Sequence, residues 1–139
     1  AAGVEIKNKE KGIFITLSDS EKPNFIKTVN KYLELGFTLY STEGTGKFLK
    51  TNGIDSVIVG KADDLGQTSL TIIEDKLVSL VINTPTYANE LSDGWKIRRL
   101  SHETGVAVVS SVREADAFIE AFLNQNLVLD DLEVIQDVS

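Results

Sequence analysis

Residues 41–47 carry the sequence STEGTGK, between a short apolar run and an amphipathic segment. The segment combines hydroxyl groups, glycines and a lysine, and groups of these types bind phosphate where backbone N–H groups point out of a helix start. It matches neither common glycine-rich nucleotide motif. Phe48 stands where a P-loop has serine or threonine, and Leu49 stands where the dinucleotide fingerprint has its third glycine. This turn therefore predicts an anion-binding helix start outside those two classes.

Further polar side chains follow the other apolar runs of the chain. In a parallel α/β sheet the strands end at one edge, and ligands bind at that edge, where helices begin. Together with the turn, these side chains make up the predicted ligand-binding set, which is Thr16, Lys22, Thr42, Gly44, Thr45, Lys61, Asn83 and Thr84. Two lysine charges, several hydroxyl groups and a helix N-terminus on one rim predict a site for a phosphate or a nucleotide.

The chain has few residues that could catalyse a reaction or hold a metal. Its single histidine, His102, falls in a predicted helix away from this rim, and we interpret it as a surface or packing residue. Asp63 and Asp64 lie in a glycine-containing loop and are interpreted as solvated acids, not as a general base or metal ligands. The sequence contains no cysteine, no HExxH pattern and no serine nucleophile motif. These features predict a binding domain without catalytic residues or a metal site of its own.

The charge balance disfavours nucleic acid as a partner. The 14 lysine and arginine residues against 21 aspartate and glutamate residues give a net charge of −7, whereas binding a phosphate backbone needs a basic face. The basic cluster of Lys96, Arg98 and Arg99 is interpreted as a solvated helix face, with Trp95 packed beside it. No apolar run approaches the roughly 18 residues of a membrane span, and no signal peptide begins the sequence. We therefore expect a cytoplasmic protein without a membrane partner.

Short apolar runs alternate with segments of helical periodicity along the chain, which at 139 residues fits one domain. The predicted strands cover residues 12–17, 38–41, 54–60, 78–82 and 106–109. One predicted helix is capped by Asp19 and Ser20 with Pro23 in its first turn, and another is opened by a capping box at Ser111 and Glu114. The other predicted helices are one that ends at residues 52–53, one at 69–75 and one at 96–103. This alternation predicts a three-layer, Rossmann-like α/β domain, in which helices flank a central, mostly parallel five-stranded sheet.

Taken in order, a set of segments resembles the methylglyoxal-synthase-like domain, and more narrowly the C-terminal allosteric domain of the large subunit of bacterial carbamoyl phosphate synthetase. The segments are residues 16–22 (TLSDSEK), 41–45 (STEGT), 59–61 (VGK), 81–84 (VINT) and 93–99 (DGWKIRR). The resemblance runs from about Gly12 to Leu123, and the order of the segments makes it specific. It implies a linker from a preceding synthetase domain at residues 1–11, a regulatory domain at 12–126 and an acidic C-terminal tail at 127–139.

The resemblance also implies a function for the rim. In the family's nucleotide pocket, Lys22 and the turn with Thr42 and Thr45 would hold the phosphate, Lys61 would add charge, and Asn83 with Thr84 would meet the ribose or base. The implied effector is a nucleotide monophosphate, either an inhibitor of the UMP type or IMP or another phosphoribosyl activator. The domain itself would need no cofactor and would not be catalytic.

The parent enzyme implied by the resemblance is a ligase. It would make carbamoyl phosphate for pyrimidine and arginine synthesis from bicarbonate, glutamine and ATP, with Mg or Mn. The remaining domains of the large subunit and a glutaminase small subunit would be the partners of this domain.

Related functions on the same fold leave alternatives. Methylglyoxal synthase itself is excluded, because its histidines are matched here by Ser18 and by the histidine-free residues 83–100. An IMP cyclohydrolase-type domain shares the first two turns but lacks a counterpart here for its distinctive segment after the third strand, and it remains the alternative together with a stand-alone sugar-phosphate sensor. Pro85 departs from relatives with a hydroxyl residue there, and residues 106–109 lack the aromatic hydroxyl of ornithine-activated members.

Overall fold

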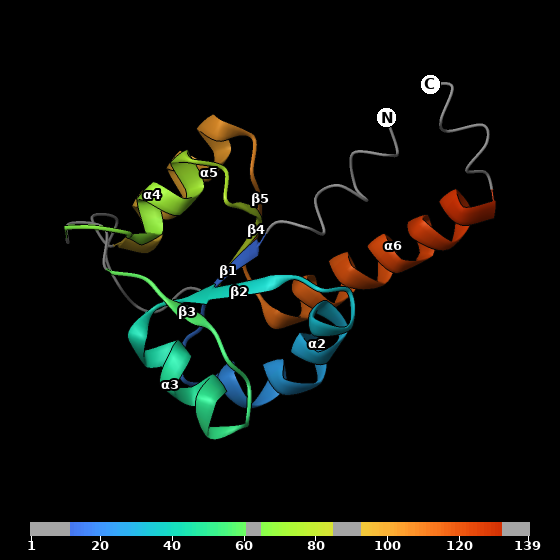
Figure 1. The fold of residues 1–139 in the computed structure, drawn as a ribbon, viewed down its shortest axis with the longest axis horizontal. Coiled ribbons are helices and arrows are strands. Elements are labelled where there is room, and N and C mark those ends of the chain that lie inside the picture. Colours follow the sequence, from blue (N-terminus) through green and yellow to red (C-terminus); the bar gives the residue numbers. More distant parts are fainter. Residues whose placement is uncertain (1–11, 61–64, 85–92, 132–139) are drawn as a thin grey trace.

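The structure, a computed structural model, describes residues 12–60, 65–84 and 93–131. Strands and helices alternate along these residues (Figure 1). The strands are β1 (Gly12–Thr16), β2 (Thr38–Ser41), β3 (Val57–Ile58), β4 (Val78–Asn83) and β5 (Ala107–Val109). The helices are α2 (Lys22–Glu34), α3 (Glu43–Thr51), α4 (Ser69–Glu74), α5 (Asp93–Thr104) and α6 (Val112–Asp131).

The strands of the described chain form one sheet in the order β3-β2-β1-β4-β5, and every pairing is parallel. Ile13 of β1 pairs with Leu39 on one side and Leu80 on the other, so β1 lies at the centre of the sheet. At the carboxyl edge, Thr16 pairs with Asn83. The predicted five-stranded parallel sheet is confirmed, and its topology brings the ends of β1, β2 and β4 together.

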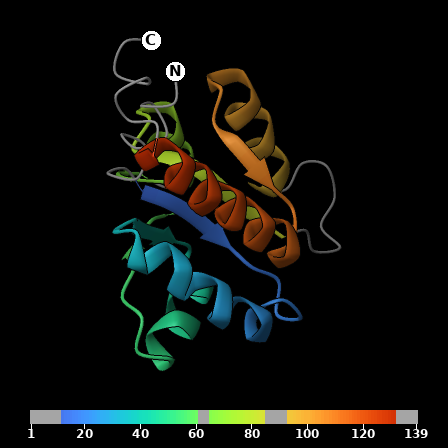
Figure 2. The ribbon, with the colours of Figure 1, turned by 90° about the vertical axis from the view of Figure 1, so that its right-hand side faces the viewer.

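Helices cover both faces of this sheet and give it three layers. Figure 2 shows α6 (red) and α2 (light blue) lying side by side over one face, where Phe25, Tyr32 and Ile119 join the apolar core. On the opposite face, Ile72 of α4 and Ile97 of α5 pack on β1 and β4 residues in a second apolar core. The burial of apolar side chains on both faces explains why the strands read as continuous apolar runs.

The edge strand β3 differs from the prediction of a strand over residues 54–60. Only Val57 and Ile58 pair, with Tyr40 and Ser41 of β2, and both side chains are about half exposed. Ile54 is buried in the core that contains α3. Past this pair, Gly60 forms an isolated parallel bridge with Thr68.

Helix starts also differ in part from the sequence prediction. Pro23 lies in the first turn of α2 as predicted, but the N-cap residue is Glu21, without a side-chain capping bond, so capping by Asp19 and Ser20 is wrong. At the start of α6, the Glu114 N–H donates to the Ser111 hydroxyl at 3.0 Å, which confirms one half of the predicted box. The Glu114 carboxylate accepts from the Ser110 N–H instead, at 2.7 Å.

Helices α5 and α6 both extend beyond the bounds predicted from the sequence. α5 begins at Asp93, three residues before its predicted start at 96. α6 runs to Asp131 and so includes residues 127–131 of the predicted acidic tail. Residues 1–11, predicted to be a linker, and 132–139 lie outside the described residues. In the part of the chain that the structure describes, no helix has the length and apolar character needed to cross a membrane.

Candidate anion-binding site

The predicted ligand-binding residues gather where the strands end and the next helices begin. Thr16 ends β1 and Asn83 ends β4, while Lys22 is the first residue of α2 and Thr42 is the N-cap of α3. Because the strands are parallel neighbours, these positions share the carboxyl edge of the sheet. Lys61, also predicted for the site, lies outside the described residues.

Thr84 joins the end of β4 to the loop that follows β1. Its backbone N–H donates to the Thr16 carbonyl at 3.0 Å, and its hydroxyl oxygen accepts from the Ser18 N–H at 2.6 Å. The Thr84 hydroxyl also donates to the Ser18 hydroxyl at 3.3 Å. Thr84 is therefore a buried positioning residue for the loop between β1 and α2.

Thr45 has the same relationship to that loop from the other side. Its side-chain oxygen accepts from the backbone N–H of Leu17 at 3.0 Å, and the residue is only 2% exposed. The expectation that Thr45 is a rim residue outside the core is therefore wrong. The N–H groups of Leu17 and Ser18 are committed to threonine hydroxyl groups, so a ligand at this edge has to find its donors elsewhere.

Those donors are available at the start of α3. The first backbone hydrogen bond of this helix runs from the Gly46 N–H to the Thr42 carbonyl, so the N–H groups of the three residues between them have no acceptor within the helix. The Thr42 hydroxyl makes no capping bond to them. A helix start with open N–H groups and a nearby hydroxyl suits an anion.

The two glycines of the turn have different roles. A Cβ atom at Gly44 would meet nothing within 4 Å, so this residue faces open space at the helix start. A Cβ atom at Gly46 would lie 2.0 Å from the Ile58 side chain and 2.8 Å from the Ser41 hydroxyl. Gly46 therefore allows α3 to pack against β2 and β3. Sequence reasoning assigned Gly44 to the site but gave no packing role to Gly46, since this long-range contact leaves no local signal.

Lys22 carries the positive charge of the described part of the site. A lysine in the first helical turn is disfavoured by the helix dipole, which indicates that its place there serves something other than the stability of α2. Its ammonium group donates to the Asp19 carboxylate at 2.7 Å. This hydrogen bond, and next the lysine charge, lower the pKa of Asp19. Lys47, at the end of the STEGTGK segment, instead pairs with Glu43 on the exposed side of α3 at 3.2 Å.

Sequence reasoning missed three residues of this region. Ser18 bonds to Thr84, the Ser18 and Ser20 hydroxyl oxygens lie 3.3 Å apart, and Asp19 bonds to Lys22. Two serines and an acid just after the first strand were a usable signal, because polar residues at that position lie on the binding edge. Asp19 and Ser20 were assigned to helix capping instead, and Ser18 was given no role in the site.

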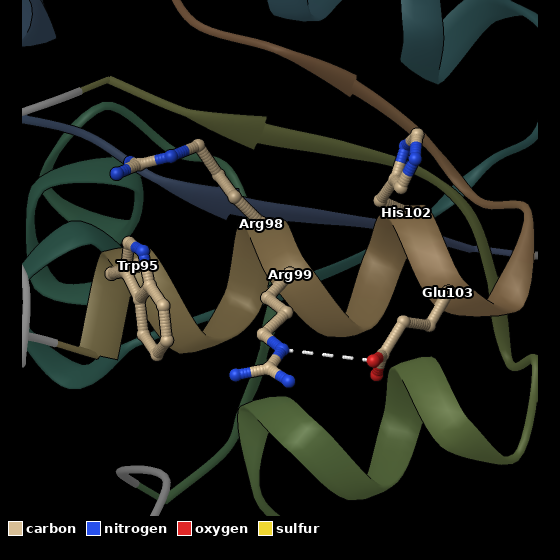
Figure 3. Close-up of a pocket in the computed structure, with 5 residues that line it drawn as sticks. All are labelled: Trp95, Arg98, Arg99, His102 and Glu103. Carbon is tan, nitrogen blue, oxygen red and sulfur yellow. Dashed lines mark ion pairs between the residues drawn. The ribbon is translucent and has the colours of Figure 1, made fainter.

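A separate hollow of about 410 Å³ lies on α5 (Figure 3) and is lined by Trp95, Arg98, Arg99, His102 and Glu103. The Arg99 guanidinium lies 5.4 Å from the centre of the Trp95 ring, and its Nε is 3.6 Å from the Glu103 carboxylate. His102 is exposed, which confirms its interpretation as a surface residue. The hollow contains none of the predicted ligand-binding residues. Among the described residues, no group of acids and histidines could hold a metal ion.

Comparison with known proteins identifies the family. A family model described as the MGS-like domain matches residues 24–110, from the first turn of α2 past the end of β5. The carbamoyl phosphate synthase large chain of Lachnoclostridium phytofermentans is 34% identical over 124 residues, which are 88% of this chain and 12% of that protein.

Two further relatives are named as sections of the same protein. The carbamoyl phosphate synthase large chain, C-terminal section, of Methanocaldococcus jannaschii is 34% identical over 110 residues, or 78% of this chain and 18% of the relative. Its counterpart from Aquifex aeolicus is 35% identical over 113 residues, or 81% and 21%. The chain thus spans between 12% and 21% of the length of these three relatives. Because the family model covers more than half of the chain and the sheet has the expected parallel architecture, the chain belongs to the family of MGS-like domains.

Proposed function

We propose that the chain is the nucleotide-binding regulatory domain of a carbamoyl phosphate synthase large chain. The observation that carries this proposal is the meeting of two helix starts at one sheet edge, with the Lys22 ammonium group on α2 and the Thr42 hydroxyl on α3. The two helices follow neighbouring parallel strands, which supports a ligand site shared by their first turns.

The phosphate of the effector is proposed to bind between these helix starts. Lys22 supplies an ammonium charge, and the open N–H groups of α3 around Gly44 supply further donors. Thr42 adds a hydroxyl group that the helix does not use. Lys61 is proposed to add a second charge.

The ribose or base is proposed to lie toward β4. Thr16 and Asn83 pair at the ends of β1 and β4, and Thr84 follows directly. Since the Thr84 hydroxyl is bonded to Ser18, we assign Thr84 to shaping this end of the pocket and Thr16 with Asn83 to contact with the ligand. The ligand class is a nucleoside monophosphate, either a UMP-type inhibitor or IMP or another phosphoribosyl activator.

The relatives favour this function over the alternatives on the same fold. All three are carbamoyl phosphate synthase large chains or sections of one, which supports a regulatory domain of that ligase over an IMP cyclohydrolase-type domain or a stand-alone sensor. The parent enzyme is proposed to form carbamoyl phosphate from bicarbonate, glutamine and ATP with Mg or Mn. Its other large-subunit domains and a glutaminase subunit are the proposed partners. Effector binding would then shift the equilibrium between conformations of the whole enzyme, with a coupling free energy on the order of 1–3 kcal/mol.

Calorimetric titration of the chain with UMP, IMP, inosine and dihydroxyacetone phosphate tests the proposal. We expect UMP or IMP to bind without turnover and inosine to bind more weakly, because it lacks the phosphate. Replacing Lys22 with alanine should weaken nucleotide binding by about 10- to 100-fold, the value of one hydrogen bond from a charged donor.

A matched control is available on the same helix. Lys27 is exposed on α2, so Lys27→Ala removes the same charge without touching the site, and it should leave the affinity unchanged. Raising the salt concentration should weaken binding to the unmodified chain more than binding to Lys22→Ala. Equal losses in the two lysine variants, or turnover of dihydroxyacetone phosphate, would contradict the proposed function.

A further inference from the structure

We propose that Asp19 competes with the phosphate of the effector for the Lys22 ammonium group, and so sets both the affinity of the site and its preference for ligand charge. This inference rests on the proposed function, because it concerns the same site. It assigns to Asp19 a role that opposes ligand binding.

The geometry of the pair is the first support. The Lys22 Nζ and the Asp19 Oδ1 lie 2.7 Å apart, as both an ion pair and a hydrogen bond. The Lys22 side chain is 20% exposed, whereas the Asp19 side chain is 95% exposed. The lysine is held by its surroundings, and the aspartate approaches from solvent. A phosphate that reaches Lys22 therefore meets an ammonium group that already has an anionic partner.

The remaining contacts give Asp19 no other role. The N-cap of α2 is Glu21, and no side chain caps this helix, so Asp19 does not hold the helix start. An exposed ion pair contributes little to folding stability. Because the Asp19 carboxylate lies almost wholly in solvent, it can turn away from Lys22 without disturbing the packed residues.

Electrostatics then predicts which ligands are affected. A phosphate dianion has to displace the carboxylate and is also repelled by it at short range, while a monoanionic phosphodiester is repelled less and a nucleoside without phosphate is not repelled. Asp19 therefore acts as a counter-ion that makes the site less selective for dianions than Lys22 alone would make it.

Titration of the unmodified chain and of Asp19→Asn with UMP and with inorganic phosphate tests this inference. Asn keeps the size of the side chain and removes its charge. We expect Asp19→Asn to bind both probes about two- to fivefold more tightly, which corresponds to removing one exposed ion pair, with a larger effect at low salt. Uridine should bind both proteins equally.

Two controls separate competition from a general change of charge. Asp55→Asn removes the same charge at an exposed residue just before β3, toward the opposite edge of the sheet, and should leave both affinities unchanged. In the Lys22→Ala background, Asp19→Asn should have a smaller effect than in the unmodified chain, because the contested ammonium group is gone.

The outcomes distinguish this inference from the proposed function. Phosphate binding that tightens in Asp19→Asn, with no binding of UMP or IMP, would support the role of Asp19 and overturn the nucleotide function. Nucleotide binding that is equal in Asp19→Asn and the unmodified chain would overturn the role of Asp19 and leave the function intact. The absence of any phosphate or nucleotide binding in all variants would overturn both.

Discussion

Tyr32 on α2 donates its phenolic O–H to the backbone carbonyl of Ala115 on α6, at a distance of 2.7 Å in the buried interface of the two helices. Lys31 beside it pairs with Asp116 at 2.8 Å and with Glu120 at 2.6 Å, both on α6. α2 carries Lys22 in its first turn, so the helix that presents the ammonium group of the candidate site is attached to α6 through residues of its second half.

Replacing Tyr32 with phenylalanine should lower the free energy of unfolding. The ring is fully buried and stays in place, so the loss is that of one hydrogen bond, about 0.5–1.5 kcal/mol. Chemical denaturation measures it. Tyr40→Phe, at a half-buried tyrosine of β2, is the matched control. Equal stability of Tyr32→Phe and the unmodified chain would show that the bond does not contribute.

Tyr32 should also make the domain sensitive to alkaline pH. Burial, and next the negative charge of Asp116, raise the pKa of the Tyr32 phenol. In the unfolded chain a tyrosine loses its proton near about pH 10. Above that pH the unfolded state is ionised while the folded state keeps its proton, so stability that is present below about pH 10 is lost as the pH rises.

The contribution of Tyr32 to the loss of stability at alkaline pH can be measured by comparing two proteins. Between about pH 10 and 11, the free energy of unfolding should fall more steeply for the unmodified chain than for Tyr32→Phe, which has no group to titrate. Parallel pH profiles of the two proteins would contradict the raised pKa in the folded state.

Alanine at the two turn glycines should have opposite effects on stability. Gly46→Ala places a methyl group against Ile58 and the buried Ser41 hydroxyl, and we expect overpacking to cost about 1–3 kcal/mol. Gly44→Ala meets no neighbour and should stabilise α3 by up to about 1 kcal/mol, because alanine favours the helix. Thermal melting compares the pair. A stable Gly46→Ala would mean that α3 shifts away from the sheet without loss.

Valine at Thr45 should destabilise the domain as well as weaken ligand binding. Thr45→Val removes the oxygen that accepts from the buried Leu17 N–H, and leaving such a donor unpaired costs about 1–3 kcal/mol. Thr45→Ser keeps the oxygen and is the control, with the loss of one methyl group as its remaining change. A melting temperature of Thr45→Val equal to that of the unmodified chain would contradict a contribution of this hydrogen bond.

Sequence periodicity was sufficient to predict the architecture of the domain. The central strands β1 and β4 are apolar on both faces, as Ile13 and Phe14 illustrate by packing into opposite cores, and this pattern indicates a sheet covered by helices on both sides. The edge strand β3 was predicted too long, because strand length depends on pairing with β2, a long-range contact that the local sequence does not contain.

The residues of the candidate site were located more accurately than their contacts. Thr16, Thr42 and Asn83 lie at the carboxyl edge, as the sequence predicted. Thr45 and Thr84, however, bond to residues 28 and 66 positions away in the chain. Hydrogen bonds over such separations depend on the order of the strands, so local patterns cannot show which hydroxyl groups the protein itself uses. The capping box of α4, in which Thr68 and Thr71 exchange hydrogen bonds, was missed because its partner is threonine instead of the usual glutamate or glutamine.

The central place of β1 has a consequence for the order of events during protein synthesis. β1 is the first strand in the described chain, yet one of its two neighbours is β4. The Thr16 carbonyl accepts its hydrogen bond from the N–H of Thr84, which is synthesised much later. A nascent chain that has emerged from the ribosome only as far as α4 carries its innermost strand with one side unpaired. Closure over such a separation is slow, because the loop entropy is lost before the contacts form. The second side of β1 is therefore paired only once residues 78–84 are free to add to the growing sheet.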